Sequence, residues 1–256
     1  MIHQTAIVEP GARLAPGVSI GAYSLIGAKV EIGAGCVIGP HVVIEGRVRL
    51  GRNNRISQFA SIGGPPQDKK YAGEDTTVEI GDGNTIREYV TINRGTAGDA
   101  GVTRIGDDNW IMAYVHFAHD CQIGSHTIFA NACELAGHVH VGDWAILGAT
   151  TLVHQFVHIG AYSFTGMGTY LDRDLPPYVK AAGNMAKPFG INSRGLRRRG
   201  FSDASVNALK RAYRSLYRAG LTLEEARREL ESQSTEWPEV RPLAAFLDGS
   251  SRGIIR

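Results

Sequence analysis

Cysteine is scarce in this sequence, which has only three, at unrelated spacings. An odd number of unevenly spaced cysteines does not predict a disulfide framework, so a reducing compartment fits best. Long apolar runs are also missing, because none approaches the roughly 18 residues that span a membrane. The first five residues lack the basic and apolar regions of a signal peptide. These absences predict a cytoplasmic protein without a membrane span.

Net charge is small as well, at +2, but it is unevenly distributed. Residues 187–220 carry nine Lys or Arg and a single acid, Asp203, so this segment is +8 and the remainder is −6. A cluster of cations suits an anionic partner or phosphate groups. A solvated helix face has the same composition, and the charge pattern alone leaves both interpretations open.

What the sequence has in excess is glycine, 32 of 256 residues, together with an internal repeat of six. Large apolar residues recur every six positions from Ile2 to Ile62, in the same phase from Ile80 to Ile92, and shifted by one from Ile105 to Ile159. Helices repeat at about 3.6 residues and strands at about 2, so a period of six indicates a short strand followed by a corner. Three units make a triangular coil of 18 residues, and stacked coils supply the core.

Two other positions of the repeat are also regular. Glycine often follows the large apolar residue, where we expect it to provide turns with positive φ. The fourth position after that residue is usually small or β-branched, and Cys36, Cys121 and Cys133 all occupy it. We therefore expect the cysteines to fill the core or corners rather than to act in catalysis or metal binding.

The repeat sets the domain organisation. We expect a mainly β protein with a parallel β-helix over residues 1–182, interrupted by excursions at 63–79 and 93–104, and a helical domain over 183–256. Long departures from a rigid repeat are usually functional. Pro176-Pro177 suggests a boundary.

Capping residues place the helices of the C-terminal domain. Ser202 is a suitable N-cap for a helix that ends near Gly220. Thr222 and Glu225 form a capping box for the next helix, and Pro238 can begin a third.

Histidines cluster in the second half of the solenoid, with seven of nine between residues 116 and 158. Residues 18 apart should stack on adjacent coils, about 4.8 Å apart. One such column contains His119, Gly137 and Gln155, and the neighbouring column contains Asp120, His138 and Phe156.

This arrangement is suited to acid–base chemistry. His119 could accept a proton from a hydroxyl, Asp120 could fix its tautomer, and the amide of Gly137 could stabilise an oxyanion. Histidines that merely line a subunit interface would give the same pattern. A zinc site of the carbonic anhydrase type is a further alternative, with ligands from His116, His119, His138 and His140.

Several segments, in order along the chain, resemble the UDP-N-acetylglucosamine O-acyltransferases, a hexapeptide-repeat family. They are Gln58-Phe59-Ala60-Ser61-Ile62-Gly63, Gln67-Asp68-Lys69-Lys70-Tyr71, Ile86-Arg87-Glu88, Arg94-Gly95-Thr96, His116-Phe117-Ala118-His119-Asp120-Cys121, Leu135-Ala136-Gly137-His138-Val139, Val153-His154-Gln155-Phe156, Pro176-Pro177-Tyr178-Val179, Arg198-Arg199-Gly200-Phe201-Ser202 and Ser251-Arg252-Gly253-Ile254-Ile255-Arg256. The match covers essentially the whole chain. It implies that the β-helix is left-handed, a property that periodicity alone does not give.

The resemblance also implies an activity and its partners. A member of this family is a homotrimer with active sites between subunits, and it catalyses the first step of lipid A biosynthesis. It transfers an (R)-3-hydroxyacyl chain from the phosphopantetheine of acyl carrier protein to the 3-hydroxyl of UDP-N-acetylglucosamine. No metal, bound cofactor or nucleic acid is implied. The basic segment would attract the acidic carrier protein.

Roles for individual residues follow from the same resemblance. His119 would be the general base, Asp120 would orient it, and Gly137 would provide the oxyanion amide. The residues that would position the sugar or the thioester are Asp68, Lys70, His116, His138 and Gln155. Those that would meet the nucleotide are Asn192, Arg198 and Arg199, and arginine suits a diphosphate because its donors match phosphate oxygens.

Met167 is expected to set the acyl-chain length, because the family residue at this position closes the acyl groove. It lies 48 residues beyond His119. At about 4.8 Å per coil this is roughly 13 Å, the span of an extended chain of about ten carbons. We therefore expect a medium chain, with ordinary packing of Met167 as the alternative.

Two positions depart from the family pattern, and three alternatives to the activity are open. Asn93 stands where the family commonly has histidine, and Arg194 where it often has glutamate. An N-acyltransferase of the same pathway carries an extra N-terminal domain, whereas the repeats here begin at Ile2. A purely structural solenoid would not need the His119–Asp120 pair. The acceptor could also be a 3-amino sugar.

Overall fold

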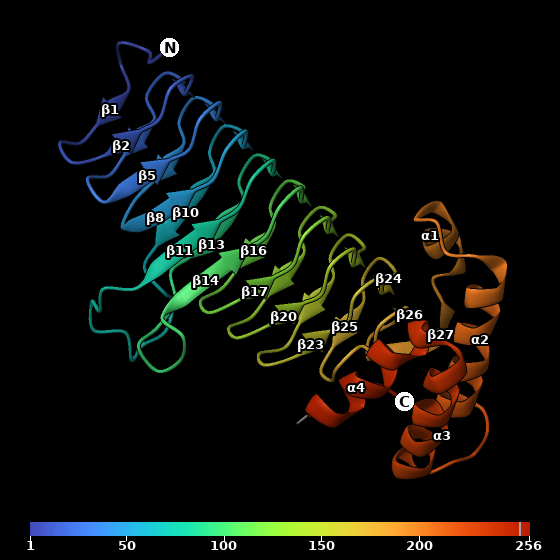
Figure 1. Cartoon of the computed structure of the whole chain (residues 1–256). Helices are drawn as coiled ribbons and strands as arrows, with labels where there is room; N and C mark the ends of the chain where they lie inside the picture. The colour runs from blue at the N-terminus through green and yellow to red at the C-terminus, as the bar shows by residue number, and fades with distance from the viewer. Residues whose placement is uncertain (251) are drawn as a thin grey trace.

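The computed structural model describes residues 1–250 and 252–256, which leaves Ser251 of the C-terminal motif outside the described residues. The chain forms a left-handed parallel β-helix closed at one end by a small helical domain, as the sequence and the resemblance predicted (Figure 1). Successive coils advance from the N-terminus toward the helices.

Each coil contributes one strand to each of three sheets. The first sheet contains β1 (Ile7–Val8), β4 (Leu25–Ile26), β7 (Val43–Ile44), β10 (Ser61–Gly64), β13 (Thr91–Asn93), β16 (His116–Phe117), β19 (Glu134–Leu135), β22 (Leu152–Val153) and β25 (Tyr170–Leu171). The second contains β2 (Arg13–Leu14), β5 (Val30–Ile32), β8 (Arg47–Leu50), β11 (Thr77–Ile80), β14 (Val102–Ile105), β17 (Gln122–Ile123), β20 (His140–Val141) and β23 (His158–Ile159). The third contains β3 (Ser19–Ile20), β6 (Val37–Ile38), β9 (Arg55–Ile56), β12 (Thr85–Ile86), β15 (Trp110–Ile111), β18 (Ile128–Phe129), β21 (Ile146–Leu147), β24 (Phe164–Thr165), β26 (Val179–Ala182) and β27 (Lys187–Ile191).

The six-residue repeat fills the interior of these coils. Its large apolar residues are buried from Ile20 to Ile159, and Phe117 and Phe129 are fully enclosed. Exceptions occur only in the first coil, where Ile2 is 49% exposed because no coil lies beneath it. The three cysteines are buried and free, and burial raises the pKa of Cys133 to about 11, so the prediction that they are core fillers is confirmed.

The role predicted for the repeated glycines is wrong. Gly21 does not have a positive φ; the left-handed residue of that corner is Tyr23, with φ 58°. Glycine is required there for another reason, since a Cβ on Gly21 would lie 2.5 Å from the backbone nitrogen of Pro40 in the next coil. Close approach of successive coils, rather than turn conformation, selects glycine after the apolar residue.

The two excursions leave the solenoid at the same corner, which we call the first corner because it joins the first sheet to the second. One runs through residues 65–76 between β10 and β11, and the other through 94–101 between β13 and β14. Ile92 pairs with Phe117, so that coil holds seven residues more than a regular turn of eighteen. In Figure 1 both excursions project from the same side of the solenoid. The corresponding second corner joins the second sheet to the third, and the third corner joins the third sheet to the first.

The solenoid continues past the proline pair. Leu175 bridges to Ile159 and β26 pairs in parallel with β24, so Pro176 and Pro177 lie within the last coil rather than at a boundary. The chain then reverses, and β27 pairs antiparallel with β26. This hairpin, which the repeat did not predict, leads into the helices.

The helical domain contains α1 (Ser193–Arg198), α2 (Asp203–Tyr217), α3 (Leu223–Glu236), a 3-10 turn η1 (Pro238–Val240) and α4 (Arg241–Gly249). Ser202 caps α2, and the Thr222–Glu225 capping box begins α3, as predicted. The end of the chain returns to the solenoid, where Asp174 bridges to Ile254 and accepts a 2.6 Å hydrogen bond from Ser250. Within the described residues, no helix is long and apolar enough to cross a bilayer.

Candidate active site

The first corner holds the predicted column of His119, Gly137 and Gln155. The N–H of His138 donates to the carbonyl of His119, and the N–H of Phe156 donates to that of Gly137, so the three coils are stacked in register. A Cβ on Gly137 would lie 2.6 Å from Cε1 and 2.8 Å from Nε2 of His119. Only glycine therefore leaves room for the imidazole ring above the backbone of the next coil.

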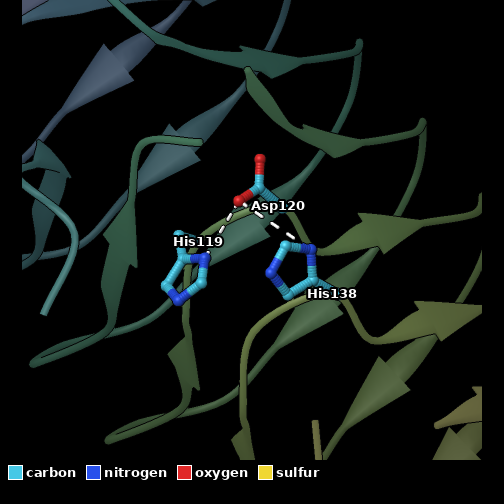
Figure 2. A group of neighbouring side chains, drawn as sticks. All are labelled: His119, Asp120 and His138. Carbon is cyan, nitrogen blue, oxygen red and sulfur yellow. Dashed lines mark hydrogen bonds and ion pairs between the residues drawn. The ribbon is translucent and has the colours of Figure 1, made fainter. Parts of the chain in front are cut away.

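His119 is paired with a buried carboxylate. Its Nδ1 lies 2.9 Å from Oδ2 of Asp120, whose side chain is completely buried (Figure 2). The carboxylate also accepts hydrogen bonds from the N–H of Thr96 at 3.0 Å and from its hydroxyl at 2.7 Å. With Nδ1 held by Asp120, Nε2 is the nitrogen of His119 left to exchange a proton with a ligand.

Thr96 belongs to the second excursion, and its contact with Asp120 was not predicted. In the sequence, the segment Arg94-Gly95-Thr96 stands out only through the family resemblance. The signal that identifies it is the position of the excursion, which leaves the first corner one coil before His119. The loop thus completes the hydrogen bonding of the Asp120 carboxylate.

His138 lies beside this pair and is held on three sides. Its ring meets that of His119 edge-on, with centroids 5.0 Å apart, and stacks on Phe156 at 4.4 Å. Its Nδ1 lies 2.7 Å from Oδ2 of Asp99, a second loop residue that sequence reasoning missed. This hydrogen bond lowers the pKa of the Asp99 carboxyl, so Asp99 is ionised at neutral pH.

His116 is on the outer face of the first sheet, in β16. Its Nδ1 lies 2.7 Å from the hydroxyl of Thr91. Burial lowers the pKa of His116, which keeps the ring neutral near pH 7. A groove of about 360 Å³ runs from His116 across this sheet, past Leu152 and His154, to Tyr170.

Met167 stands at the opposite edge of the same sheet. It follows β24 at the third corner, and the residue is 79% exposed. The groove on the first sheet therefore lies between the corner of His119 and the corner of Met167. Gln155, directly above Gly137 in the column, is exposed at the first corner.

Asp68 and Lys70 lie in the first excursion, which starts two coils before His119. The Asp68 carboxylate accepts a 3.0 Å hydrogen bond from the N–H of Lys70, and the lysine side chain is exposed. Among the described residues, no hydrogen bond joins either side chain to the His119 column.

The three residues expected at the nucleotide lie elsewhere, near the second corner. Asn192 caps α1 by accepting from the N–H of Gly195 at 3.1 Å, and it donates to the carbonyl of Tyr162 at 3.1 Å. The guanidinium of Arg199 lies 3.7 Å from the ring centroid of Trp144, whereas Arg198 is exposed. Burial lowers the pKa of Arg199. A single chain therefore does not bring these residues together with His119, which is at the first corner.

The acid–base cluster also has the composition of a metal site. His119, Asp120 and His138 can each offer a ligand atom, and these atoms lie within 4.8 Å of one another. Two imidazoles and a carboxylate suit a divalent transition metal. Within the described residues the cluster contains His119 and His138 but not His116 or His140, the other two histidines that the zinc alternative named as possible ligands.

Comparison with known proteins agrees with this architecture. Residues 174–255 match the family model described as UDP N-acetylglucosamine O-acyltransferase, domain 2, and residues 29–64 and 103–137 match that of the bacterial transferase hexapeptide. The acyl-(acyl-carrier-protein)–UDP-N-acetylglucosamine O-acyltransferase of Herminiimonas arsenicoxydans is 57% identical over 260 residues, which cover 100% of this chain and 99% of that protein.

Solved structures give the same result. LpxA from Acinetobacter baumannii superimposes with a TM-score of 0.98 at 46% identity, over 100% of this chain and 99% of its own. The UDP-N-acetylglucosamine acyltransferase of Francisella novicida also has a TM-score of 0.98, at 42% identity, over 100% of this chain and 94% of its own. The chain is thus an acyltransferase and belongs to the family of the acyl-(acyl-carrier-protein)–UDP-N-acetylglucosamine O-acyltransferases.

Proposed function

We propose that this protein transfers an (R)-3-hydroxyacyl group from acyl carrier protein to the 3-hydroxyl of UDP-N-acetylglucosamine, the first step of lipid A biosynthesis, with His119 as general base. The names of its relatives supply the donor and the acceptor. The observation that supports the mechanism is the His119–Asp120 pair beside the bare backbone of Gly137. The reducing compartment expected from the cysteines supports a cytoplasmic location for the proposed reaction.

The proposed reaction needs one proton acceptor and one oxyanion donor. Nε2 of His119 removes the proton of the sugar hydroxyl as its oxygen attacks the thioester carbonyl. The N–H of Gly137, for which the described residues provide no acceptor, stabilises the oxyanion. Collapse of the tetrahedral intermediate breaks the C–S bond, and the imidazolium returns its proton to the departing phosphopantetheine thiolate. In this scheme Asp120 holds the tautomer and stabilises the imidazolium.

The active site is proposed to lie between subunits of a homotrimer. The support is the separation of the two sets of residues: His119 is at the first corner, whereas Arg199 is at the second corner against Trp144. A neighbouring copy could present its second-corner residues and helical domain to the first corner of this chain. In that arrangement Asn192, Arg198 and Arg199 would meet the nucleotide, while Asp68, Lys70, His116, His138 and Gln155 would position the sugar or the thioester.

The decisive experiment measures acyl transfer from acyl carrier protein to UDP-N-acetylglucosamine, with donors of several chain lengths, for the wild type and His119→Ala. Loss of a general base should lower kcat/KM by roughly 10²–10⁴-fold. His41→Ala, a histidine of the third corner, is the control and should keep wild-type activity. Retention of activity in His119→Ala would rule out the proposed base. Transfer only to a 3-amino sugar would change the acceptor but leave the mechanism in place.

A further inference from the structure

The second excursion contacts the candidate site twice, through Thr96 and Asp99, and the proposed reaction steps involve neither residue. At its base, Thr96 donates to the buried carboxylate of Asp120. At its tip, Asp99 reaches His138 in the coil above His119. The tip itself is exposed, since Ala97, Gly98 and Ala100 have few neighbours around them.

The Asp99 contact joins a carboxylate that is 47% exposed to an imidazole that is mostly buried. Its acceptor atom lies 2.7 Å from Nδ1 of His138, and the His138 side chain is only 15% exposed. Phe156 covers one face of the ring, and the edge-on ring of His119 lies beside it. Because an ionised carboxylate can only accept, Nδ1 of His138 carries the hydrogen. Nε2 is then the nitrogen available to a ligand.

Two histidine–aspartate pairs therefore stand side by side at the first corner. In each pair an aspartate accepts from Nδ1, and Nε2 has no hydrogen-bond partner among the described residues. Oδ2 of Asp120 also lies 4.0 Å from Nδ1 of His138 (Figure 2), which is beyond hydrogen-bond distance, so Asp99 is the carboxylate that binds this nitrogen. The pairs differ in where the aspartate comes from. Asp120 lies within the regular repeat, between β16 and β17, whereas Asp99 lies in the second excursion, outside the repeat.

We propose that Asp99 is a positioning residue for the acyl transfer, which fixes the tautomer and orientation of His138 so that Nε2 faces the reacting groups. This inference rests on the proposed function. The second excursion would then orient both pairs, because Thr96 at its base binds Asp120 and Asp99 at its tip binds His138. Among the described residues, His138 is the one side chain that hydrogen-bonds or forms an ion pair with the Asp99 carboxylate.

The primary test is Asp99→Asn, which keeps the size of the side chain. The amide can turn its NH₂ toward Nδ1, which forces the hydrogen of a neutral His138 onto Nε2. We expect kcat/KM to fall by roughly 10–100-fold, the usual cost of removing an outer partner of a functional histidine. Most of the loss should be in kcat. Asp99→Glu, which keeps the carboxylate, should recover part of it, and Ala97→Ser in the same loop should match the wild type.

A double-mutant cycle separates positioning from general loosening of the loop. If Asp99 acts through His138, adding Asp99→Asn to His138→Gln should cost less than about twofold beyond His138→Gln alone. Full additivity of the two losses would overturn the proposal, and so would wild-type kinetics in Asp99→Asn.

A second measurement does not depend on the proposed reaction. In protein labelled with ¹⁵N-histidine, the ring signals of His138, identified by their loss in His138→Gln, should show a protonated Nδ1 in the wild type and a change of tautomer in Asp99→Asn. Unchanged signals would refute the role of Asp99 even if acyl transfer is confirmed. A tautomer change in a protein that transfers no acyl group would instead refute the proposed function and leave the pairing intact.

Discussion

The first and second corners of the solenoid share one backbone. Each has a left-handed residue in successive coils, such as Asp120 (φ 61°) and His138 (φ 62°) at the first and His126 (φ 60°) and Trp144 (φ 64°) at the second. Left-handed conformations outside glycine often indicate stored strain at functional sites. Here they recur in every part of the repeat, so the conformation of Asp120 belongs to the scaffold and says nothing about catalysis.

The difference between the corners lies in what covers them. At the second corner, Trp144 stacks on His126 with centroids 4.0 Å apart and is covered by Arg199 from the helical domain. At the first corner, the two excursions leave the solenoid, and one of them binds Asp120 and His138. We therefore expect catalysis at the first corner, where a polar loop has been added to the repeat. We expect the aromatic stacking at the second corner to contribute mainly to the stability of the fold.

The largest loss of activity should come from adding a methyl group at the first corner, at a position where the second corner already has one. Gly137 and Ala161 occupy equivalent positions, two residues after the buried apolar residues Leu135 and Ile159. In Gly137→Ala the new Cβ would collide with the His119 ring, so the ring must move. We expect kcat/KM to fall at least about 100-fold, because small displacements of a catalytic group are costly.

The reverse substitution, Ala161→Gly, is the matched control. It should lower the free energy of unfolding by roughly 0.5–1 kcal/mol through added backbone freedom. Activity should stay at the wild-type level. Equal losses of activity in both variants would show that the first corner has no special role.

The contrast between corners also explains what the sequence could predict. The repeat fixes which residues are 18 apart, and this was enough to place His119 over Gly137 and to bury the three cysteines. Residues 94–101 lie outside the repeat, so no periodicity relates Asp99 to His138, 39 residues away.

The helical domain likewise contains helices that the sequence predicts and one that it does not. Side-chain caps at Ser202 and Thr222 have a local sequence signature, and both helices began where predicted. The helix α1, capped by Asn192, is only six residues long, and the sequence did not predict it. A short helix has too little amphipathic pattern to be recognised.

Met167 tests whether the third corner shares in function. The residue is 79% exposed in the single chain, so Met167→Gly should leave the melting temperature within about 1 °C of the wild-type value. If it closes the acyl groove, the ratio of kcat/KM for a fourteen-carbon donor to that for a ten-carbon donor should rise at least about tenfold, since each buried methylene contributes to binding. Phe189→Ala, another exposed apolar residue, is the control. An unchanged ratio would reduce Met167 to ordinary packing.

Arg199 tests the closure of the second corner. Its guanidinium lies 3.7 Å from the Trp144 centroid and should contribute about 1 kcal/mol to docking of the helical domain. Arg199→Ala should therefore lower the melting temperature by roughly 2–4 °C. Arg198→Ala removes the same charge from an exposed position and should not. An equal fall in melting temperature in the two variants would mean that the loss of positive charge, rather than the loss of stacking on Trp144, causes the effect.

His116 should give the smallest effect, seen only as a pH dependence. Burial lowers its pKa in the folded protein, so below about pH 6.5 the unfolded chain binds a proton that the folded chain does not. The stability that depends on a neutral His116 is therefore complete above that pH, and it is lost as the pH falls toward the lower pKa of the folded state. The urea midpoint of His116→Gln should therefore decline less than that of the wild type between pH 7.5 and 5.5. His3→Gln, an exposed histidine in the first coil, controls for the loss of one titrating side chain. If the urea midpoint declined equally in all three proteins, protonation of groups other than His116 would govern the loss of stability at acid pH.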